Sequence, residues 1–504
     1  MSARTLSERT VSAGQWRMAA WGVQAALQLG FGVVLARLLP PRDFGVVALA
    51  WVVVSFAELL AQLGLGVALV QRSDLTARHV RTAFTASLLT GAAAAALLWV
   101  LAPFSGPLLD APDLPPVMRG LSLLFLTGAL GGTARALLQR RLDFRALFVV
   151  DVTSYGAGYA GVALALALAG HGVWSLVWGT VAQSLLASVL ALALARHPLR
   201  PLLGRIELRE LCGFGVAASL NQLVNHAARN ADNLLVGRLL GAGALGLYGR
   251  AFNLMTLPLA AVGDVMWHVL LPAMSEVKDD RARLGRAYLA AVQASALAAA
   301  PLMAGIAAAA PHLAEGVYGP AWAGMALPLR LLCAAGLFRA VYHVSGALTH
   351  ASGRVYSELW RQAAYAALVV GGAALGARWG VGGVAAAVAG AIGFMYLAMA
   401  RLSLTIVGRG WRDFFAAQLP GVALGLLTGA AVLAASRLLE ARGAGHLAIF
   451  AADVAAGGLA LLLGLALLPD ALRPAELFGR LEGSVRRLPA TLRLPLARVL
   501  RLSA

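Results

Sequence analysis

Residues 82–104 read TAFTASLLTGAAAAALLWVLAPF, with Arg78 and Arg81 just before them and Asp110 and Asp113 shortly after. An uncharged α-helix of this length, rising about 1.5 Å per residue, crosses the roughly 30 Å of hydrocarbon in a bilayer. Basic residues collect at the cytoplasmic ends of such helices. The stretch therefore predicts a membrane-spanning helix whose arginine end lies in the cytoplasm.

The same pattern continues along the whole chain. Arginine is concentrated in the N-terminal tail and in every second connection between apolar stretches, and the other connections carry few basic residues. This alternation places both termini in the cytoplasm and predicts a multi-pass protein of the cytoplasmic (inner) membrane. We predict fourteen spans, at residues 14–36, 44–66, 82–104, 117–138, 146–169, 173–195, 211–236, 245–271, 287–309, 323–348, 356–377, 381–406, 414–436 and 446–468.

The composition excludes a soluble fold of this length. Hydrophobic residues make up 60% of the 504 residues and charged residues 13%, and the mean hydropathy is +0.77. The formal net charge of +18 is spread over the ends of the predicted spans. That distribution favours attraction to anionic lipid over nucleic-acid binding. We expect an all-α polytopic membrane protein with membrane lipid, and no nucleic acid, among its partners.

Two pairs of similar segments indicate an internal duplication. Residues 34–39 (VLARLL) match 235–240 (LVGRLL), and 171–174 (HGVW) match 379–382 (WGVG) at a similar offset. Repeats of six spans insert with the same orientation, so the axis relating them would run along the membrane normal. We predict an N-terminal six-helix lobe at 1–208, a C-terminal six-helix lobe at 209–408, helices 13 and 14 at 409–469 and a basic cytoplasmic tail at 470–504.

Polar side chains inside the predicted spans are the functional candidates, because charged groups at membrane depth are costly and usually face a cavity. Asn221, Asn225 and Arg229 recur at every fourth position and share one face of the seventh span. The charges lean positive, which suits an anionic ligand such as a phosphate or pyrophosphate. Two other interpretations stay open: Arg229 could pair with Asp232 to join helices, and Arg250 could lie near the membrane interface.

Few residues match the requirements of enzyme chemistry. The only lysine, Lys278, follows Val277 instead of a glycine, which excludes a Walker A loop for ATP hydrolysis. The sequence also lacks Cys and His clusters at metal-ligand spacing, His-Glu-x-x-His and Gly-x-Ser-x-Gly. We expect no catalytic residue, metal or cofactor and a protein that is not an enzyme, although a site buried between helices stays possible.

Four stretches carry a family resemblance: 36–48 (ARLLPPRDFGVVA), 62–72 (QLGLGVALVQR), 231–241 (ADNLLVGRLLG) and 245–252 (LGLYGRAF). They resemble bacterial polysaccharide transporters, the Wzx-type flippases of the multidrug/oligosaccharidyl-lipid/polysaccharide (MOP) superfamily. The resemblance implies two six-helix lobes, plus two further helices, that rock about a central cavity. By alternating access such proteins carry an undecaprenyl-pyrophosphate-linked glycan across the membrane for lipopolysaccharide (O-antigen) or exopolysaccharide biosynthesis.

The resemblance gives the intramembrane polar residues expected roles. Cavity arginines would hold the pyrophosphate, and acidic residues would couple transport to a cation gradient. The lipid-linked oligosaccharide is the expected ligand, with polysaccharide polymerase and export machinery as further candidate partners. The candidate substrate-binding residues are Arg17, Gln24, Gln28, Asn221, Asn225, Arg229, Arg250 and Arg339, and the candidate ion-coupling residues are Glu58, Asp232 and Asp264.

Two alternatives to a flippase stay open. The same scaffold could be a cation-coupled drug or metabolite antiporter, which predicts a compact pocket of acidic and aromatic side chains. A membrane glycan polymerase or lipid-linked transferase would need a large outer loop or a metal-binding acidic pair. The basic character of the spans and the short outer loops favour the flippase.

Overall fold

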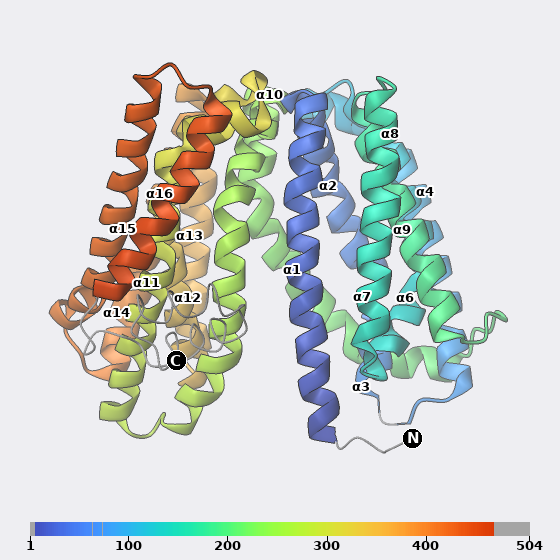
Figure 1. Ribbon diagram of the computed structural model, residues 1–504. Coiled ribbons are helices and arrows are strands. Elements are labelled where there is room, and N and C mark those ends of the chain that lie inside the picture. The colour runs from blue at the N-terminus through green and yellow to red at the C-terminus, as the bar shows by residue number, and fades with distance from the viewer. Residues whose placement is uncertain (1–5, 63, 73, 468–504) are drawn as a thin grey trace. The chain divides into compact units, whose positions relative to one another are not determined.

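The computed structural model describes residues 6–62, 64–72 and 74–467 (Figure 1). At residues 6–21, 59–62, 212–229, 261–269 and 355 it describes the course of the backbone alone, and the predicted basic tail lies outside the described residues. Every regular element in the described part of the chain is a helix, which confirms the predicted all-α class. The chain divides into two compact units, Met1–Gly246 and Leu247–Ala504.

The helices of the first unit follow the predicted spans. The fifth span is one continuous helical stretch that contains a π-helical segment, η1, between α7 and α8. The unit contains α1 (Leu6–Leu38), α2 (Pro41–Gln62), α3 (Leu65–Gln71), α4 (Ala77–Leu109), α5 (Leu114–Leu121), α6 (Leu123–Arg140), α7 (Phe144–Thr153), η1 (Ser154–Gly161), α8 (Val162–Leu168), α9 (Val173–Ala195) and the first part of α10 (Arg205–Glu276).

The long helix α10 is two helical segments joined at a glycine. Gly241 has φ 85° and ψ 171°, a conformation that glycine adopts readily because it has no Cβ. This break separates the predicted spans 211–236 and 245–271. Along the chain, the boundary between the two compact units lies a few residues later, between Gly246 and Leu247. The predicted lobes rest on the sequence repeat, and their boundaries stay a prediction.

Small residues bring α6 and α9 close together in the first unit. A Cβ atom on Gly131 would lie 2.3 Å from Ser188 Oγ and 2.6 Å from Ser188 Cα. Ser188 Oγ donates to the carbonyl oxygen of Thr127 at 2.6 Å, and the Thr127 and Ser184 hydroxyls are 2.7 Å apart. Close backbone approach combined with interhelical hydroxyl bonds is the usual way in which membrane helices associate.

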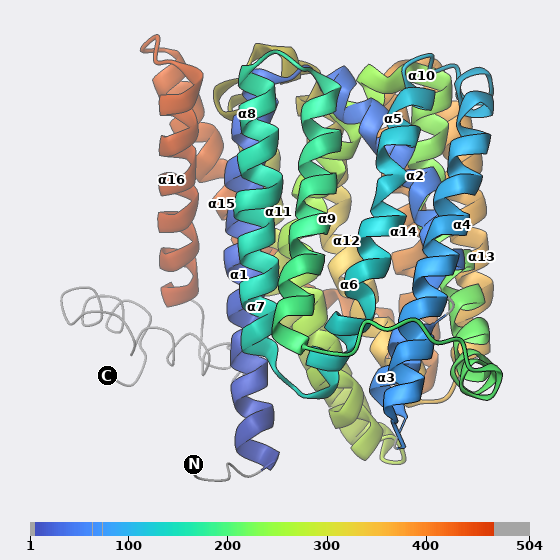
Figure 2. The same ribbon diagram turned by 90° about the vertical axis from the view of Figure 1, so that its right-hand side faces the viewer.

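The second unit uses the same device between α11 and α15. Gly421, Gly425 and Gly429 lie four residues apart on α15, and added Cβ atoms would meet Ala296, Ala300 and Ala304 of α11 respectively. Figure 2 shows α16 beside α15, and the two helices are in contact. Besides the rest of α10, the unit contains α11 (Arg281–His312), η2 (Leu313–Tyr318), η3 (Pro320–Met325), α12 (Ala326–Ala351), α13 (Val355–Gly376), η4 (Ala377–Trp379), α14 (Gly380–Val407), α15 (Trp411–Glu440) and α16 (His446–Leu467).

The helices have the length and hydropathy of membrane spans. Within the described residues, nine helical stretches meet both requirements, and one of them, Tyr356–Val407, contains two predicted spans. The described part of α1, Gly22–Leu38, is a shorter apolar helix. Each predicted span overlaps a helix, so the multi-pass membrane class is confirmed, and the count of fourteen stays a prediction.

Candidate functional site

A cavity of about 770 Å³ lies inside the first unit, and polar and charged side chains are set into its largely apolar wall; we refer to it as the polar cavity. Its wall is formed by residues from α1, α2, α3, α4, α6, α7, η1 and α9. Polar lining at membrane depth is costly unless it is hydrogen-bonded or meets water or a ligand. The cavity is therefore the candidate functional site within this unit. Polar residues on its wall include Gln24, Glu58, Thr90, Arg135, Asp151 and Gln183.

An ion pair joins two helices at the cavity wall. Arg135 Nη2 on α6 lies 2.7 Å from Asp151 Oδ1 on α7. The side chains of Arg135 and Asp151 keep 41% and 27% of their surface exposed. A guanidinium group has five N–H donors, more than a single carboxylate contact uses. Arg135 can therefore stay paired with Asp151 and still donate hydrogen bonds to an anionic or hydroxyl-bearing ligand.

Hydroxyl groups line another part of the cavity. Thr180 Oγ1 donates to the carbonyl oxygen of Leu176 at 2.7 Å, and Ser154 Oγ donates to the carbonyl oxygen of Asp151 at 3.2 Å. These bonds run back along the same helix, which satisfies each hydroxyl proton and leaves an oxygen lone pair available. Thr133 is buried on the same wall, and its hydroxyl has no hydrogen-bond partner among the described residues. An unpaired buried hydroxyl of this kind gains a partner only when the wall opens to water or to a ligand hydroxyl.

A charged cluster holds one end of the first unit together. Glu210 Oε2 at the start of α10 lies 2.9 Å from both Arg72 Nη2 and His79 Nε2. The hydrogen bond from His79, supported by the charge of Arg72, lowers the pKa of Glu210 below its usual value of 4.5. Thr76 also caps α4 through reciprocal bonds with His79. The cluster therefore ties the α3–α4 connection to α10 at the end where arginine predicts the cytoplasm.

The structure brings together two of the predicted residues in this unit. Gln24 and Glu58 line the same cavity, while Gln28 is exposed on α1 and is not part of its wall. Asp232 is buried on α10, and its Oδ1 accepts a hydrogen bond from the backbone N–H of Asn233 at 2.9 Å. The remaining predicted side chains lie outside the described ones: Arg17, Asn221, Asn225, Arg229 and Asp264.

The two predicted arginines of the second unit lie over aromatic rings. The Arg250 guanidinium carbon is 5.6 Å from the ring centre of Tyr318 and 5.7 Å from that of Trp322. The corresponding distance from Arg339 to Phe252 is 5.3 Å. Cation–π contacts of this kind stabilise an arginine by roughly 0.5–2 kcal/mol. They give both residues a packing role, and their predicted role in substrate binding stays a prediction.

The sequence interpretation missed the ion pair at the cavity. Arg135 falls in the predicted span 117–138, and Asp151 falls in the span 146–169. Both are charged residues at membrane depth, and the rule that selected Glu58 selects them as well. Neither belongs to a run of polar residues at helical spacing like the one in the seventh span, and so neither was among the predicted site residues. Thr180, Gln183 and Ser184 gave no comparable signal, because uncharged polar residues are common in apolar helices.

Comparison with known proteins identifies the family. The family described as "Polysaccharide biosynthesis protein" matches residues 34–327. The chain belongs to this family. Lipopolysaccharide biosynthesis protein WzxC of Escherichia coli (strain K12) is 26% identical over 357 residues, which are 70% of this chain and 72% of that protein. Succinoglycan biosynthesis transport protein ExoT of Rhizobium meliloti (strain 1021) is 30% identical over 290 residues, 58% of each protein. The predicted resemblance to polysaccharide transporters is thereby confirmed.

The fold is also found among solved structures. A structure titled "Lipid II flippase MurJ, inward closed conformation" matches with a TM-score of 0.68 and 12% sequence identity. The match covers 94% of this chain and 99% of the other. At that identity the similarity concerns the fold alone, and it confirms a transporter-like arrangement of helices.

Proposed function

We propose that this protein is a flippase that moves a polyprenyl-pyrophosphate-linked oligosaccharide across the cytoplasmic membrane for surface polysaccharide biosynthesis. The family membership supports this proposal, as do relatives whose names place them in lipopolysaccharide biosynthesis and succinoglycan transport. The observation that carries it is the polar cavity of about 770 Å³ inside a unit of apolar helices. A glycan headgroup needs such a polar environment because it cannot enter hydrocarbon without losing its hydrogen bonds.

The residues at the cavity suit the chemistry of this cargo. Gln24, Thr90 and Gln183 offer neutral donors and acceptors for sugar hydroxyls, and Arg135 offers a cation for phosphate or acidic sugars. The other candidates rest on their polarity inside predicted spans, and we propose that the arginines among them contact pyrophosphate and that the amide side chains contact the glycan. Those further substrate-binding candidates are Arg17, Gln28, Asn221, Asn225, Arg229, Arg250 and Arg339.

Acidic residues are the proposed coupling groups. Glu58 lies at the cavity and Asp232 is buried on α10; Asp264 completes the set. A carboxylate at membrane depth gains or loses a cation at little structural cost when its neighbours change, which is how it links an ion gradient to alternating access. Moving a lipid breaks no covalent bond, so the proposed function requires no catalytic residue and is not that of an enzyme.

The proposed location is the inner membrane, with both termini in the cytoplasm. The arginine-rich connections support this orientation through the positive-inside rule. In this orientation the lipid-linked oligosaccharide would be taken up from the cytoplasmic leaflet. It would be released where polymerase and export machinery can use it, and these are the further partners that we propose.

Deletion of the gene tests the function. We expect lipid-linked repeat units to accumulate on the cytoplasmic leaflet and surface polysaccharide to be lost, and wild-type protein should restore both. R135A should restore less export than wild type at equal expression. R145A is the matched control, because Arg145 is an exposed arginine near the start of α7 and does not line the cavity. Normal surface polysaccharide without trapped intermediates would contradict the proposal, and failure to make the lipid-linked unit would indicate an enzyme.

One observation favours a second candidate, a cation-coupled drug antiporter. The cavity combines the carboxylates of Glu58 and Asp151 with the rings of Trp51 and Phe125. Acidic and aromatic groups together suit an organic cation. If this were the function, the deletion strain would become sensitive to cationic drugs while its surface polysaccharide stayed normal.

A further inference from the structure

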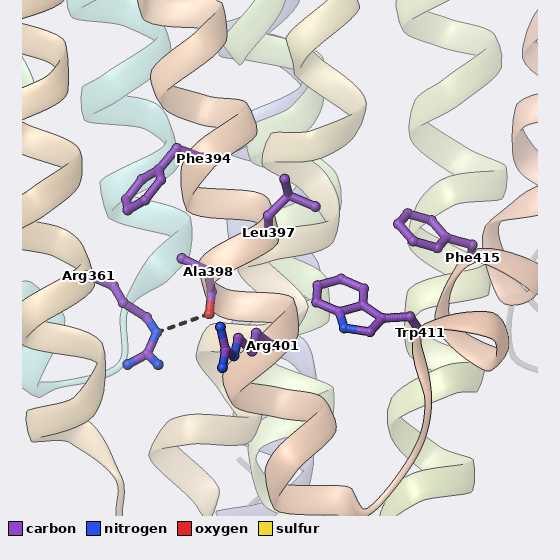
Figure 3. A pocket seen from close by; sticks show the side chains of 7 residues that line it. All are labelled: Arg361, Phe394, Leu397, Ala398, Arg401, Trp411 and Phe415. Atoms are coloured by element: carbon purple, nitrogen blue, oxygen red, sulfur yellow. Dashed lines mark hydrogen bonds between the residues drawn. The ribbon is translucent and has the colours of Figure 1, made fainter.

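A second pocket, separate from the polar cavity, opens in the second unit at one end of α13, α14 and α15. Its volume is about 730 Å³. Figure 3 shows its seven lining side chains: Arg361 from α13; Phe394, Leu397, Ala398 and Arg401 from α14; and Trp411 and Phe415 from α15. The pocket therefore combines two arginines with a mainly apolar wall.

The two arginines differ in how they are held. Arg361 Nε donates to the carbonyl oxygen of Ala398 at 3.0 Å (Figure 3). Its Nη1 donates to the carbonyl oxygen of Ser357 at 2.5 Å. These bonds fix the guanidinium group and leave further N–H donors unused. Arg401 is exposed one turn beyond Ala398, and its side chain makes no hydrogen bond or ion pair with the described residues. Arg361 is thus prearranged, and Arg401 is available to a ligand.

The wall beside the arginines is aromatic and aliphatic. Phe394, Leu397, Trp411 and Phe415 are all exposed large apolar side chains. Trp411 and Phe415 stack with ring centres 5.8 Å apart. On α14 the order along the helix is Phe394, Leu397, Arg401, so the apolar side chains lie deeper in the predicted span than the cation. A ligand that fits both parts has an anionic head and an apolar body.

The pocket lies toward the cytoplasmic ends of two predicted spans, where long arginine side chains can extend to the lipid headgroups. Arg361 lies six residues after the first residue of α13, and Arg401 lies six residues before the last residue of α14. At about 1.5 Å per residue both are about 9 Å from the helix ends. Arg354 and Arg409 flank the same ends, and the positive-inside rule assigns that side to the cytoplasm. The cytoplasmic leaflet is the one whose anionic lipids attract basic residues.

We propose that this pocket binds an anionic phospholipid of the cytoplasmic leaflet, with the phosphate between Arg361 and Arg401 and an acyl chain along Leu397 and Phe394. Basic pockets between membrane helices are suited to such headgroups, and tryptophan is common at this depth. The phospholipid would be a resident ligand and not the transported cargo.

The lining argues against the glycan-bearing lipid at this position. Apart from the two guanidinium groups and the indole N–H of Trp411, the seven lining side chains carry no polar group. A glycan would leave most of its hydroxyls without partners here, and each unpaired polar group is costly. A phosphodiester headgroup needs only the two guanidinium groups as its polar partners.

Native mass spectrometry of the full-length protein in detergent tests the proposal. Phosphatidylglycerol is titrated against wild type, R401Q and R354Q, with phosphatidylcholine as the neutral lipid. Loss of one charge-assisted contact should weaken phosphatidylglycerol binding to R401Q about tenfold, and R401K should retain it. R354Q removes the same charge at the same membrane face but outside the pocket, so it should bind like wild type. Equal thermal stability of R401Q and wild type in phosphatidylcholine shows that the variant is folded.

Three results would overturn the proposal. R401Q could bind phosphatidylglycerol as tightly as wild type, or wild type could bind phosphatidylcholine equally well. Alternatively, undecaprenyl pyrophosphate could displace phosphatidylglycerol at lower concentration than phosphatidylglycerol itself requires, which would make this a cargo site. The readout is lipid binding without transport, so its outcome is independent of whether the protein is a flippase.

Discussion

The ion pair between Arg135 and Asp151 joins α6 to α7 at the wall of the polar cavity. Replacing Arg135 by alanine leaves the carboxylate of Asp151 in the unit without its 2.7 Å partner. Breaking a buried pair costs about 3–5 kcal/mol, whereas an exposed pair contributes about 0–1 kcal/mol. Because the two side chains are 41% and 27% exposed, we expect R135A to lower the free energy of unfolding by about 2 kcal/mol.

A double-mutant cycle measures this contribution directly. The free energies of unfolding of wild type, R135A, D151N and R135A/D151N are compared by denaturation in mixed micelles. A pair in contact should show a coupling energy of about 1–2 kcal/mol, because the second substitution costs little once its partner is gone. Strictly additive effects of the two substitutions would show that the ion pair does not contribute to stability.

The charge-swapped variant R135D/D151R separates packing from binding. It restores an ion pair between α6 and α7, so most of the lost stability should return. It also moves the cation from α6 to α7, and transport should therefore stay impaired if Arg135 contacts the cargo. Full transport by the swapped variant would show that the pair serves only to join the helices.

Three further predictions concern packing, pH and the second unit. G131A should lower the free energy of unfolding by about 1–3 kcal/mol, because its Cβ meets the facing helix. The control G128A has open space around it. In the same denaturation assay it should be neutral or stabilising by up to about 1 kcal/mol. Burial lowers the pKa of His197 below its usual 6.5, so the unfolded chain takes up a proton more readily than the folded one. The contribution of His197 to the free energy of unfolding should be complete above pH 6.5 and be lost as pH falls through the folded-state pKa. Melting curves of H197F should lose part of this pH dependence. R250Q should lower the free energy of unfolding by about 1–2 kcal/mol. R250K should keep most of the wild-type stability, because a lysine still places a cation over the two rings. Equal melting temperatures for both variants would contradict a cation–π role.

Much of the fold follows from local sequence. Twenty apolar residues in a row leave few alternatives to a membrane helix, because the backbone must satisfy its own hydrogen bonds in lipid. The break within α10 was also predictable, since two spans end and begin on either side of Gly241. The π-helical segment Ser154–Gly161 was not predicted. The segment packs against α9, and a glycine-rich apolar run does not specify which hydrogen-bond register the helix takes.

The candidate site was only partly predictable. Gln24 and Glu58 were selected from their polarity inside spans, and the structure places both at one cavity. The ion pair on the wall of the same cavity, Arg135 with Asp151, comes from α6 and α7. Which helices face one another is decided by tertiary packing through small residues such as Gly131. Polarity within a span identifies the candidates, and the packing decides which of them meet.

Flipping can be measured with purified protein in proteoliposomes that contain an undecaprenyl-pyrophosphate-linked oligosaccharide in both leaflets. A membrane-impermeant reagent that modifies the glycan reports how much of it reaches the outer leaflet over time. We predict that wild-type protein makes the inner-leaflet pool accessible and that R135A does so more slowly than R145A. Accessibility that stays at the outer-leaflet fraction of protein-free liposomes, with correctly folded protein and an imposed cation gradient, would contradict this prediction.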